Sequence, residues 1–233
     1  MIALHKKLIQ NTAVLIFANS AAKDALAKKN CANPSLFDQL THHTLDMVKA
    51  TGLPYFHFSE KEQRGETFAK RLSHAIQSVF QLGYSQVISI GNDTPNLRKS
   101  HILDAHRRLT PQNVVLGPSL DGGFYLLGMH RSHFDAEAFE ALPWQQAALY
   151  QKTTSYFKTK GAAVHALDKL IDIDSVADLK LLCNHIKTLS KKWIGFFSSL
   201  LDQNSSFISP PLEALPKIPL RVPSNKGSPF SFA

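Results

Sequence analysis

The stretch Gln86-Val-Ile-Ser-Ile-Gly-Asn-Asp-Thr-Pro95 decides the fold. Its first five residues are rich in β-branched side chains and predict a buried strand. The strand runs directly into a loop, in which Gly91 lets the backbone approach a ligand closely and Pro95 biases Thr94 toward an extended conformation. Such a strand-end loop is typical of α/β proteins, which bind ligands at the carboxyl ends of their parallel strands.

Short apolar runs alternate with helical patterns on both sides of this stretch. Further strands are predicted over residues 12–18, 55–58, 113–116, 124–128 and 163–167, and helices over residues 35–50, 66–82, 99–109, 145–160 and 175–189. Ser35 is the expected N-cap of the first of these helices. The helix at 66–82 is the clearest, because its apolar residues recur at three- and four-residue spacing and Gly83 follows in the C′ position. This alternation predicts βαβ units and a mostly parallel sheet.

The composition excludes several classes of protein. The chain has 233 residues, 44% of them hydrophobic and 19% charged, which indicates a globular protein. No apolar run approaches the roughly 20 residues that span a bilayer. The two cysteines, Cys31 and Cys183, provide no disulfide framework, and the N-terminus lacks signal-peptide order, so we expect a cytoplasmic protein. The net charge is +8, but basic residues are not interleaved with aromatic ones, which argues against nucleic-acid binding.

The chain is predicted to divide near residue 190. Residues 1–190 form the predicted domain, and residues 191–233 are expected to be a short helix followed by a tail rich in proline and serine. The segment from Trp193 to Leu201 either packs its aromatic side chains on the body or grips a membrane surface. Part of the basic surplus lies in the tail, and we expect part of the remainder to offset a site for phosphates.

Three aspartates follow predicted strands, and each has two interpretations. Asp93 suits a divalent cation with oxygen ligands, or closes its own loop as an Asx turn. Asp121 faces a ligand beside the small Gly122 and Gly123, or belongs to an ordinary Asp-Gly-Gly hairpin turn. Asp174 either closes on a metal near Asp93 or belongs to the cap of the following helix. Asp172 lies on the same side of that extended segment as Asp174.

The stretch from Gln63 to Thr67 precedes the clearest helix. Free N–H groups at a helix start attract anions, and Arg64 adds a positive charge there. Gln63 is suited to hydrogen bonds with a base or sugar edge. The alternative is a simple junction between loop and helix with Gly65 as N-cap.

Taken in order, these segments resemble a known family. The matching motifs are QRG at 63–65, VISIGNDTP at 87–95, VVLGPSLDGGFYLLG at 114–128, LPW at 142–144 and DIDSVADL at 172–179. They resemble bacterial glycosyltransferase-like proteins known as radical-SAM/selenodomain-associated transferases, of the nucleotide-diphospho-sugar transferase (GT-A) superfamily. The resemblance covers roughly residues 12–190. It implies a Rossmann-like GT-A three-layer sandwich with a mostly parallel mixed sheet, and a nucleotide-activated substrate.

The resemblance also implies roles for particular residues. Asp93 and Asp174 would hold a divalent metal, Mg²⁺ or Mn²⁺, and Asp121 and Asp174 would serve in catalysis. The residues expected to contact the nucleotide are Phe17, Ala18, Asn19, Lys23, Gln63, Gly65 and Asn92. The small-molecule acceptor would meet Gly122, Gly123 and Trp144. A metal can neutralise a diphosphate leaving group, and a carboxylate can take the proton of an attacking hydroxyl.

The chain departs from this family after its first strand. Active relatives carry a Lys-x-Pro-x-x-Gly-x-x-Lys-Thr-Arg-Leu loop there, whereas residues 18–29 contain neither a glycine nor a Thr-Arg pair and are predicted to be helical. Two functions therefore lead: a metal-dependent transferase of glycosyl or nucleotidyl groups, or a non-catalytic descendant that binds a nucleotide or a partner. A peripheral membrane protein is the third interpretation, and homodimer formation is left open.

Overall fold

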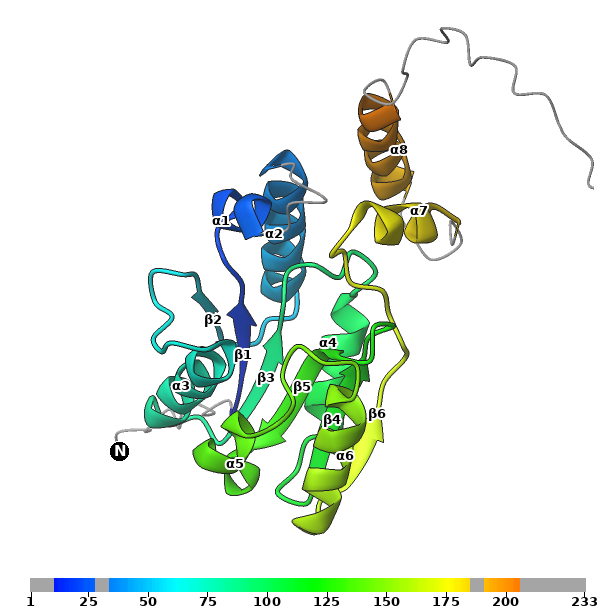
Figure 1. Ribbon diagram of the computed structural model, residues 1–233. Coiled ribbons are helices and arrows are strands. Elements are labelled where there is room, and N and C mark those ends of the chain that lie inside the picture. Colours follow the sequence, from blue (N-terminus) through cyan, green and yellow to red (C-terminus); the bar gives the residue numbers. More distant parts are fainter. Residues whose placement is uncertain (1–10, 28–33, 185–190, 206–233) are drawn as a thin grey trace, which may run out of the picture.

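The computed structural model describes residues 11–27, 34–184 and 191–205, and within them six strands form one mixed sheet (Figure 1). The strand order is β2-β1-β3-β5-β4-β6. Only β5 runs antiparallel to its neighbours within this described part. The strands are β1 (Thr12–Phe17), β2 (Tyr55–Phe58), β3 (Gln86–Ile90), β4 (Asn113–Pro118), β5 (Phe124–His130) and β6 (Ala163–Ala166).

The direction of β5 follows from the length of its connection. Five residues, 119–123, separate β4 from β5, which allows a hairpin but not the long crossover that parallel neighbours need. Of the two interpretations of Asp-Gly-Gly, the hairpin turn is therefore confirmed. The other strands are joined by helices, as the alternating pattern predicts.

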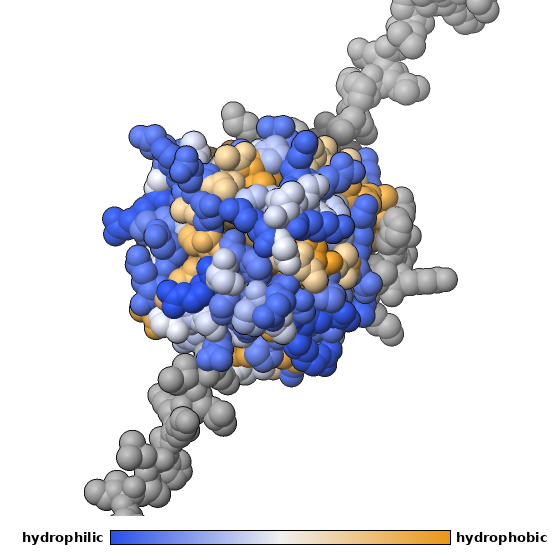
Figure 2. Space-filling view, turned by 90° about the horizontal axis from the view of Figure 1, so that it is seen from below, coloured by the Kyte–Doolittle hydropathy of each residue, from blue (hydrophilic) through white to orange (hydrophobic). Residues whose placement is uncertain are grey.

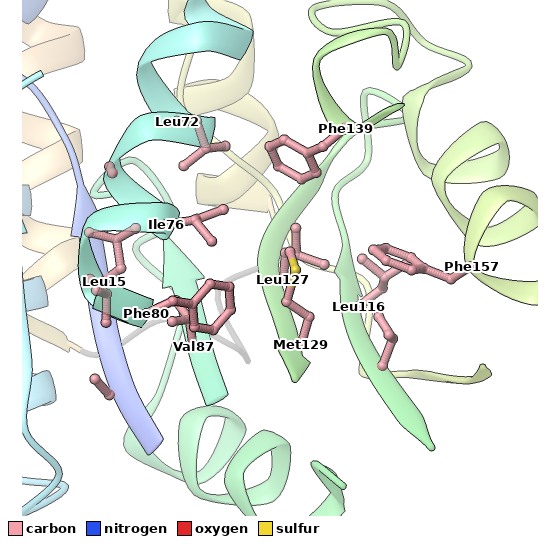
Figure 3. Packing of buried hydrophobic residues seen from close by; sticks show 14 of the residues in the cluster. Leu15, Leu72, Ile76, Phe80, Val87, Leu116, Leu127, Met129, Phe139 and Phe157 are labelled. Carbon is pink, nitrogen blue, oxygen red and sulfur yellow. The ribbon is translucent and has the colours of Figure 1, made fainter. Parts of the chain in front are cut away.

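Helices cover both faces of the sheet and complete three layers (Figure 1). The helices of the first face are α3 (Phe68–Gln81), α5 (Ala136–Glu140) and α6 (Leu149–Thr159); those of the second are α2 (Pro34–Lys49) and α4 (Lys99–Arg108). Alternate strand residues serve the two layers, since Leu15 joins the first core while Val14 and Ile16 join the second. Figure 3 shows part of the first core, in which Leu72 and Ile76 of α3 point toward the sheet.

Several element boundaries differ from the prediction. Helix α2 begins at Pro34, so Ser35 lies inside the first turn and is not the N-cap; proline suits a first helical position because its φ is already helical. Helix α3 begins at Phe68 with Thr67 as N-cap, so the alternative in which Gly65 is the N-cap is wrong. Thr67 is the N-cap because its side-chain oxygen accepts a hydrogen bond from the Lys70 N–H, whereas glycine has no side chain that could accept one.

The predicted helix over 145–160 starts only at Leu149. The short helix α5 and a 3-10 turn, η2 (Arg131–His133), precede it and carry no long periodic pattern that would have revealed them. Residues 18–29, predicted to be helical, include α1 (Ala21–Ala27).

A third apolar cluster lies beyond the carboxyl ends of the strands and joins α1 and α2 to α7 (Val176–Asn184) and α8 (Lys191–Ser205). In α8, Trp193, Phe197 and Leu200 are buried there, and the Trp193 and Phe197 rings stack with centroids 5.0 Å apart. The aromatic side chains of this segment thus pack on the body, which favours the first of its two interpretations. Among the described residues no helix is long and apolar enough to cross a membrane. The predicted tail over 206–233 lies outside the described residues.

The opposite end of the molecule has a different character. Seen from below, its surface is mostly hydrophilic, with hydrophobic residues scattered between polar ones (Figure 2). Open α/β sheets bind their ligands at the other end, beyond the carboxyl ends of strands such as β1 and β3.

Candidate functional site

A pocket of about 370 Å³ lies at the carboxyl ends of the central strands. Its walls come from the ends of β1 and β3, the β4–β5 turn, one face of α3, the connection between α5 and α6, and the segment that follows β6. The volume falls in the range of small-molecule sites, and the position is the one where open α/β sheets bind ligands.

The segment after β6, residues 167–174, crosses the sheet to reach this pocket; we call it the crossing segment. Its Leu170 N–H donates to the Pro118 carbonyl at 3.1 Å, and its Ile173 N–H donates to the Asp93 carbonyl at 2.8 Å. These backbone bonds attach it first to the end of β4 and then to the loop after β3. As a result, its Asp172 and Asp174 line the same pocket as Asp93.

Asp172 occupies an unusual electrostatic position in this pocket. Burial and the nearby Asp93 carboxylate raise the pKa of Asp172 to about 8, with smaller contributions in the same direction from Asp121 and Asp174. A hydrogen bond from Thr94 Oγ1 to Asp172 Oδ1, at 2.5 Å, acts in the opposite direction. Three other aspartates, Asp93, Asp121 and Asp174, thus raise the pKa of Asp172 in the same direction as its burial does.

Asp121 both closes its turn and faces the pocket, so its two interpretations are compatible. Its Oδ1 accepts hydrogen bonds from Ser119 Oγ at 2.5 Å and from the Gly123 N–H at 3.0 Å. Both bonds fall on the same oxygen. Oδ2 is therefore the oxygen that this turn leaves available to a ligand.

Helix α1, which follows β1, places a fifth carboxylate, Asp24, in the pocket wall. Asp24 is buried, and its oxygens accept hydrogen bonds from the side-chain amides of Asn19 at 2.8 Å and Asn92 at 3.3 Å. The same Asn92 amide donates to Thr41 Oγ1 at 2.9 Å. This network joins the first strand-end loop to the one after β3 and to α2.

Glu60 anchors the same loop from outside the pocket. Its carboxylate accepts hydrogen bonds of 2.6 Å from both the N–H and the hydroxyl of Ser20. These two bonds lower the pKa of Glu60, and the positive charge of Lys23 lowers it a little further. Lys23 itself is exposed and does not line the pocket.

An aromatic wall faces the carboxylates. It consists of Phe17, Phe68, Phe124 and Trp144, whose neighbouring rings lie 5.5 to 5.7 Å apart. The Trp144 indole N–H donates to the Phe139 carbonyl at 2.8 Å, which fixes the ring. Flat ring systems such as a nucleobase or a sugar face pack well on surfaces of this kind.

Gly122 has a packing role rather than a place in the pocket lining. Its φ is +94°, and a Cβ there would lie 2.1 Å from the Ala147 carbonyl oxygen. The Tyr150 N–H donates to the Gly122 carbonyl at 2.9 Å, so the hairpin turn holds the connection that carries Trp144 and Gln145. Gln145 lines the pocket with a φ of 60°, the one positive value among the described non-glycine residues.

Most of the predicted site residues meet in this pocket. Ten of them line it: Phe17, Ala18, Asn19, Gln63, Asn92, Asp93, Asp121, Gly123, Trp144 and Asp174. Lys23, Gly65 and Gly122 do not. The prediction omitted Asp24, Arg71, Gln145 and Asp172, which also line it.

The charge of the pocket differs from the expectation. We expected part of the basic surplus near a phosphate site, whereas the described pocket residues include five aspartates and one arginine, Arg71. Elsewhere, arginines such as Arg107 and Arg108 serve surface ion pairs with Asp104. In the part of the chain that the structure describes, no three His, Cys, Asp or Glu residues are close enough to form a ready metal site.

Comparisons with known proteins agree with the fold. The six-stranded mixed sheet with helices on both faces is a GT-A-like nucleotide-sugar transferase fold. The chain belongs to the family described as "uncharacterized protein conserved in bacteria (DUF2064)", which matches residues 13–146. Comparison with curated proteins gave no match.

Solved structures provide the fold comparison. A protein from Desulfovibrio desulfuricans G20, described as a "putative nucleotide-diphospho-sugar transferase", is 22% identical with a TM-score of 0.72, over 85% of this chain and 96% of that chain. A homologue of Mycobacterium tuberculosis rv0371c from Mycobacterium sp. strain JC1 is 11% identical with a TM-score of 0.42, over 83% of this chain and 98% of that chain. The first likeness shows the shared fold.

Proposed function

We propose that this protein is a metal-dependent transferase that moves a glycosyl or nucleotidyl group from a nucleotide-activated donor to a small acceptor. The observation that carries the proposal is the convergence of Asp93, Asp121 and Asp174, from three separate segments, on one pocket with an aromatic wall. The likeness to a nucleotide-diphospho-sugar transferase fold supports the same class of reaction. The motifs shared with radical-SAM/selenodomain-associated transferases support placing it in that narrower group.

The donor set of the pocket fits a hard divalent cation in its chemistry. Carboxylate oxygens are the ligands that Mg²⁺ and Mn²⁺ prefer. The pKa of Asp172 is raised by its burial and by the Asp93 carboxylate, and a bound cation would offset that repulsion. We propose Asp93 and Asp174 as the residues that would hold the ion. When bound, it would neutralise charge on the diphosphate of the donor.

The remaining pocket residues have separate tasks in this proposal. Asp121 presents Oδ2 to the acceptor hydroxyl and takes its proton, while the two hydrogen bonds on Oδ1 keep the carboxylate oriented. Trp144 and the other aromatic rings hold a ring of the donor or acceptor. The side-chain amide of Gln63 donates a 3.1 Å hydrogen bond to the carbonyl of Phe58, the last residue of β2, and the side-chain oxygen is left for the ligand.

The alternative is a non-catalytic protein that binds a nucleotide or a partner in the same pocket. A specific observation favours considering it: after β1, the buried Asp24 lines the pocket while Lys23 does not. A carboxylate at this position repels phosphates, whereas a basic loop would bind them. Binding and turnover therefore have to be measured separately.

Thermal unfolding with nucleoside di- and triphosphates and sugar nucleotides, each with and without Mn²⁺, tests binding. A ligand at a hundred times its dissociation constant stabilises the folded state by about 2.7 kcal/mol. We expect at least one nucleotide to raise the midpoint only when Mn²⁺ is present. If no nucleotide shifts it under either condition, the proposal is wrong.

Turnover of the nucleotide that binds distinguishes the enzyme from the binding protein. We expect Asp93→Ala to abolish turnover and Mn²⁺-dependent binding. Asp46→Ala is the matched control, because Asp46 is an exposed aspartate on α2 outside the pocket. Binding without turnover in the wild-type protein, with a panel of sugar and alcohol acceptors, would favour the alternative.

A further inference from the structure

One face of α3 brings a positive charge to the pocket. Phe68, Arg71 and Leu72 follow the i, i+3, i+4 spacing of a helix face, and all three line the pocket. Arg71 is the single cation among the described lining residues. The pocket is thus divided between carboxylates from the strand-end loops and an arginine from the helix.

The guanidinium of Arg71 makes few hydrogen bonds to the described part of the protein. In the described part of the chain it makes one hydrogen bond, from Nη1 to the Glu66 carbonyl at 3.5 Å, and no ion pair. An arginine side chain has five N–H donors in a planar fork that matches a phosphate in two-point contact. Arg108, by contrast, donates to Asp104 at 2.8 Å. Arg71 therefore reaches the pocket with most of its donors uncommitted.

The backbone beneath Arg71 is closely packed. Gly65 has a φ of +127°, and a Cβ at this position would lie 2.8 Å from Lys70 Cβ and 3.1 Å from the Arg71 nitrogen. The turn that carries Gln63 thus folds back onto the first turn of α3, and Thr67 caps that helix. This explains why Gly65 matters without lining the pocket: it allows the approach that places Gln63 and Arg71 in one wall.

We propose that Arg71 binds the diphosphate of a nucleotide ligand and supplies a positive charge to a pocket whose other charged residues, among those described, are all aspartates. This inference rests on the proposed function, since it takes the ligand to be a nucleotide. The reason is electrostatic: five aspartates in the lining repel an anion, so the phosphates of a ligand are stabilised where the one arginine faces them. The α3 side of the pocket is therefore an anion subsite, distinct from its carboxylate side.

The test compares ligands that differ only in their phosphates. Binding of a nucleoside diphosphate and of its parent nucleoside is measured by calorimetry, with Mn²⁺, for wild type, Arg71→Met, Arg71→Lys and Arg64→Met. Arg64 is the matched control, because it is an exposed arginine of the neighbouring turn that does not line the pocket. Thermal unfolding of each free variant verifies that it is folded.

We expect Arg71→Met to weaken binding of the diphosphate about 10- to 100-fold, and binding of the nucleoside less than about 2-fold. Arg71→Lys should fall between wild type and Arg71→Met, because lysine keeps the charge but not the planar fork. Arg64→Met should bind like wild type. Equal diphosphate affinity of wild type and Arg71→Met, or equal losses for the two methionine variants, would overturn the inference while leaving the proposed function intact. Failure of wild type to bind any nucleotide would overturn both.

Discussion

The contact between Gly122 and Ala147 makes a quantitative prediction about stability and the pocket. In Gly122→Ala, the new Cβ would lie 2.1 Å from the Ala147 carbonyl oxygen, an overlap with backbone that no side-chain rotation relieves. Adopting a left-handed conformation costs a non-glycine residue about 1–2 kcal/mol. Steric overpacking in a fixed structure adds about 1–3 kcal/mol. The expected destabilisation is therefore about 2–5 kcal/mol.

Gly52→Ala provides the control that separates the two contributions. Gly52 has a similar positive φ of +74°, but a Cβ there would meet nothing within 4 Å. Gly52→Ala should therefore lower the free energy of unfolding only by the cost of the left-handed conformation, about 1–2 kcal/mol. Urea unfolding followed by circular dichroism measures both variants against wild type.

Ligand binding is a second readout of the contact between Gly122 and Ala147. Because the Gly122 turn supports the connection bearing Trp144, Gly122→Ala should also weaken ligand binding, whereas Gly52→Ala should not. If Gly122→Ala is no less stable than Gly52→Ala, the packing described for this turn is wrong.

Three further predictions concern other parts of the fold. Burial lowers the pKa of His101, and its Nδ1 accepts a hydrogen bond from the Arg98 N–H at 3.1 Å, which also requires the neutral ring. As the pH falls, His101 is therefore protonated in the unfolded chain before it is protonated in the folded one. Wild type should thus lose stability relative to His101→Gln between pH 7.5 and 5, and parallel urea-unfolding curves would contradict this. Trp193→Ala should destabilise by about 3–5 kcal/mol, because it empties a buried aromatic site; a loss below about 1 kcal/mol in urea would show that α8 does not pack as described. Glu60→Gln should lower the free energy of unfolding by about 1 kcal/mol at pH 7, because the Ser20 bonds lose their charged acceptor. This difference should shrink as the pH falls through the lowered pKa of Glu60, where the wild-type carboxylate is itself protonated. A difference that does not change with pH in urea unfolding would refute this origin.

Much of the fold could be predicted from local patterns. The strands at 55–58 and 86–90 are found at their predicted residues, because β-branched and aromatic runs bounded by turn residues are strong local signals. The Asp-Gly-Gly turn predicted the hairpin that reverses β5. Helix α5 could not be recognised, since five residues are too few to show a helical period.

The site was predictable where it follows strands and not where it depends on packing. Asp93 and Asp121 follow strands, and the rule that ligands bind at strand ends identified them. The sequence assigns Asp172 no role of its own beside Asp174, because only the path of the crossing segment shows that Thr94 and three carboxylates surround Asp172. Arg71 lies on a helix, where sequence does not show which face meets the pocket.

A crystal structure with Mn²⁺ and a nucleoside diphosphate would test the central claim most directly, because the anomalous signal of manganese locates the ion without assumptions. We predict one manganese peak between the carboxylates of Asp93 and Asp174, with the aromatic wall against a ring of the ligand. The diphosphate should lie between that ion and Arg71. Manganese or nucleotide bound only outside this pocket, or an Asp93→Ala crystal with the same manganese peak, would contradict the account.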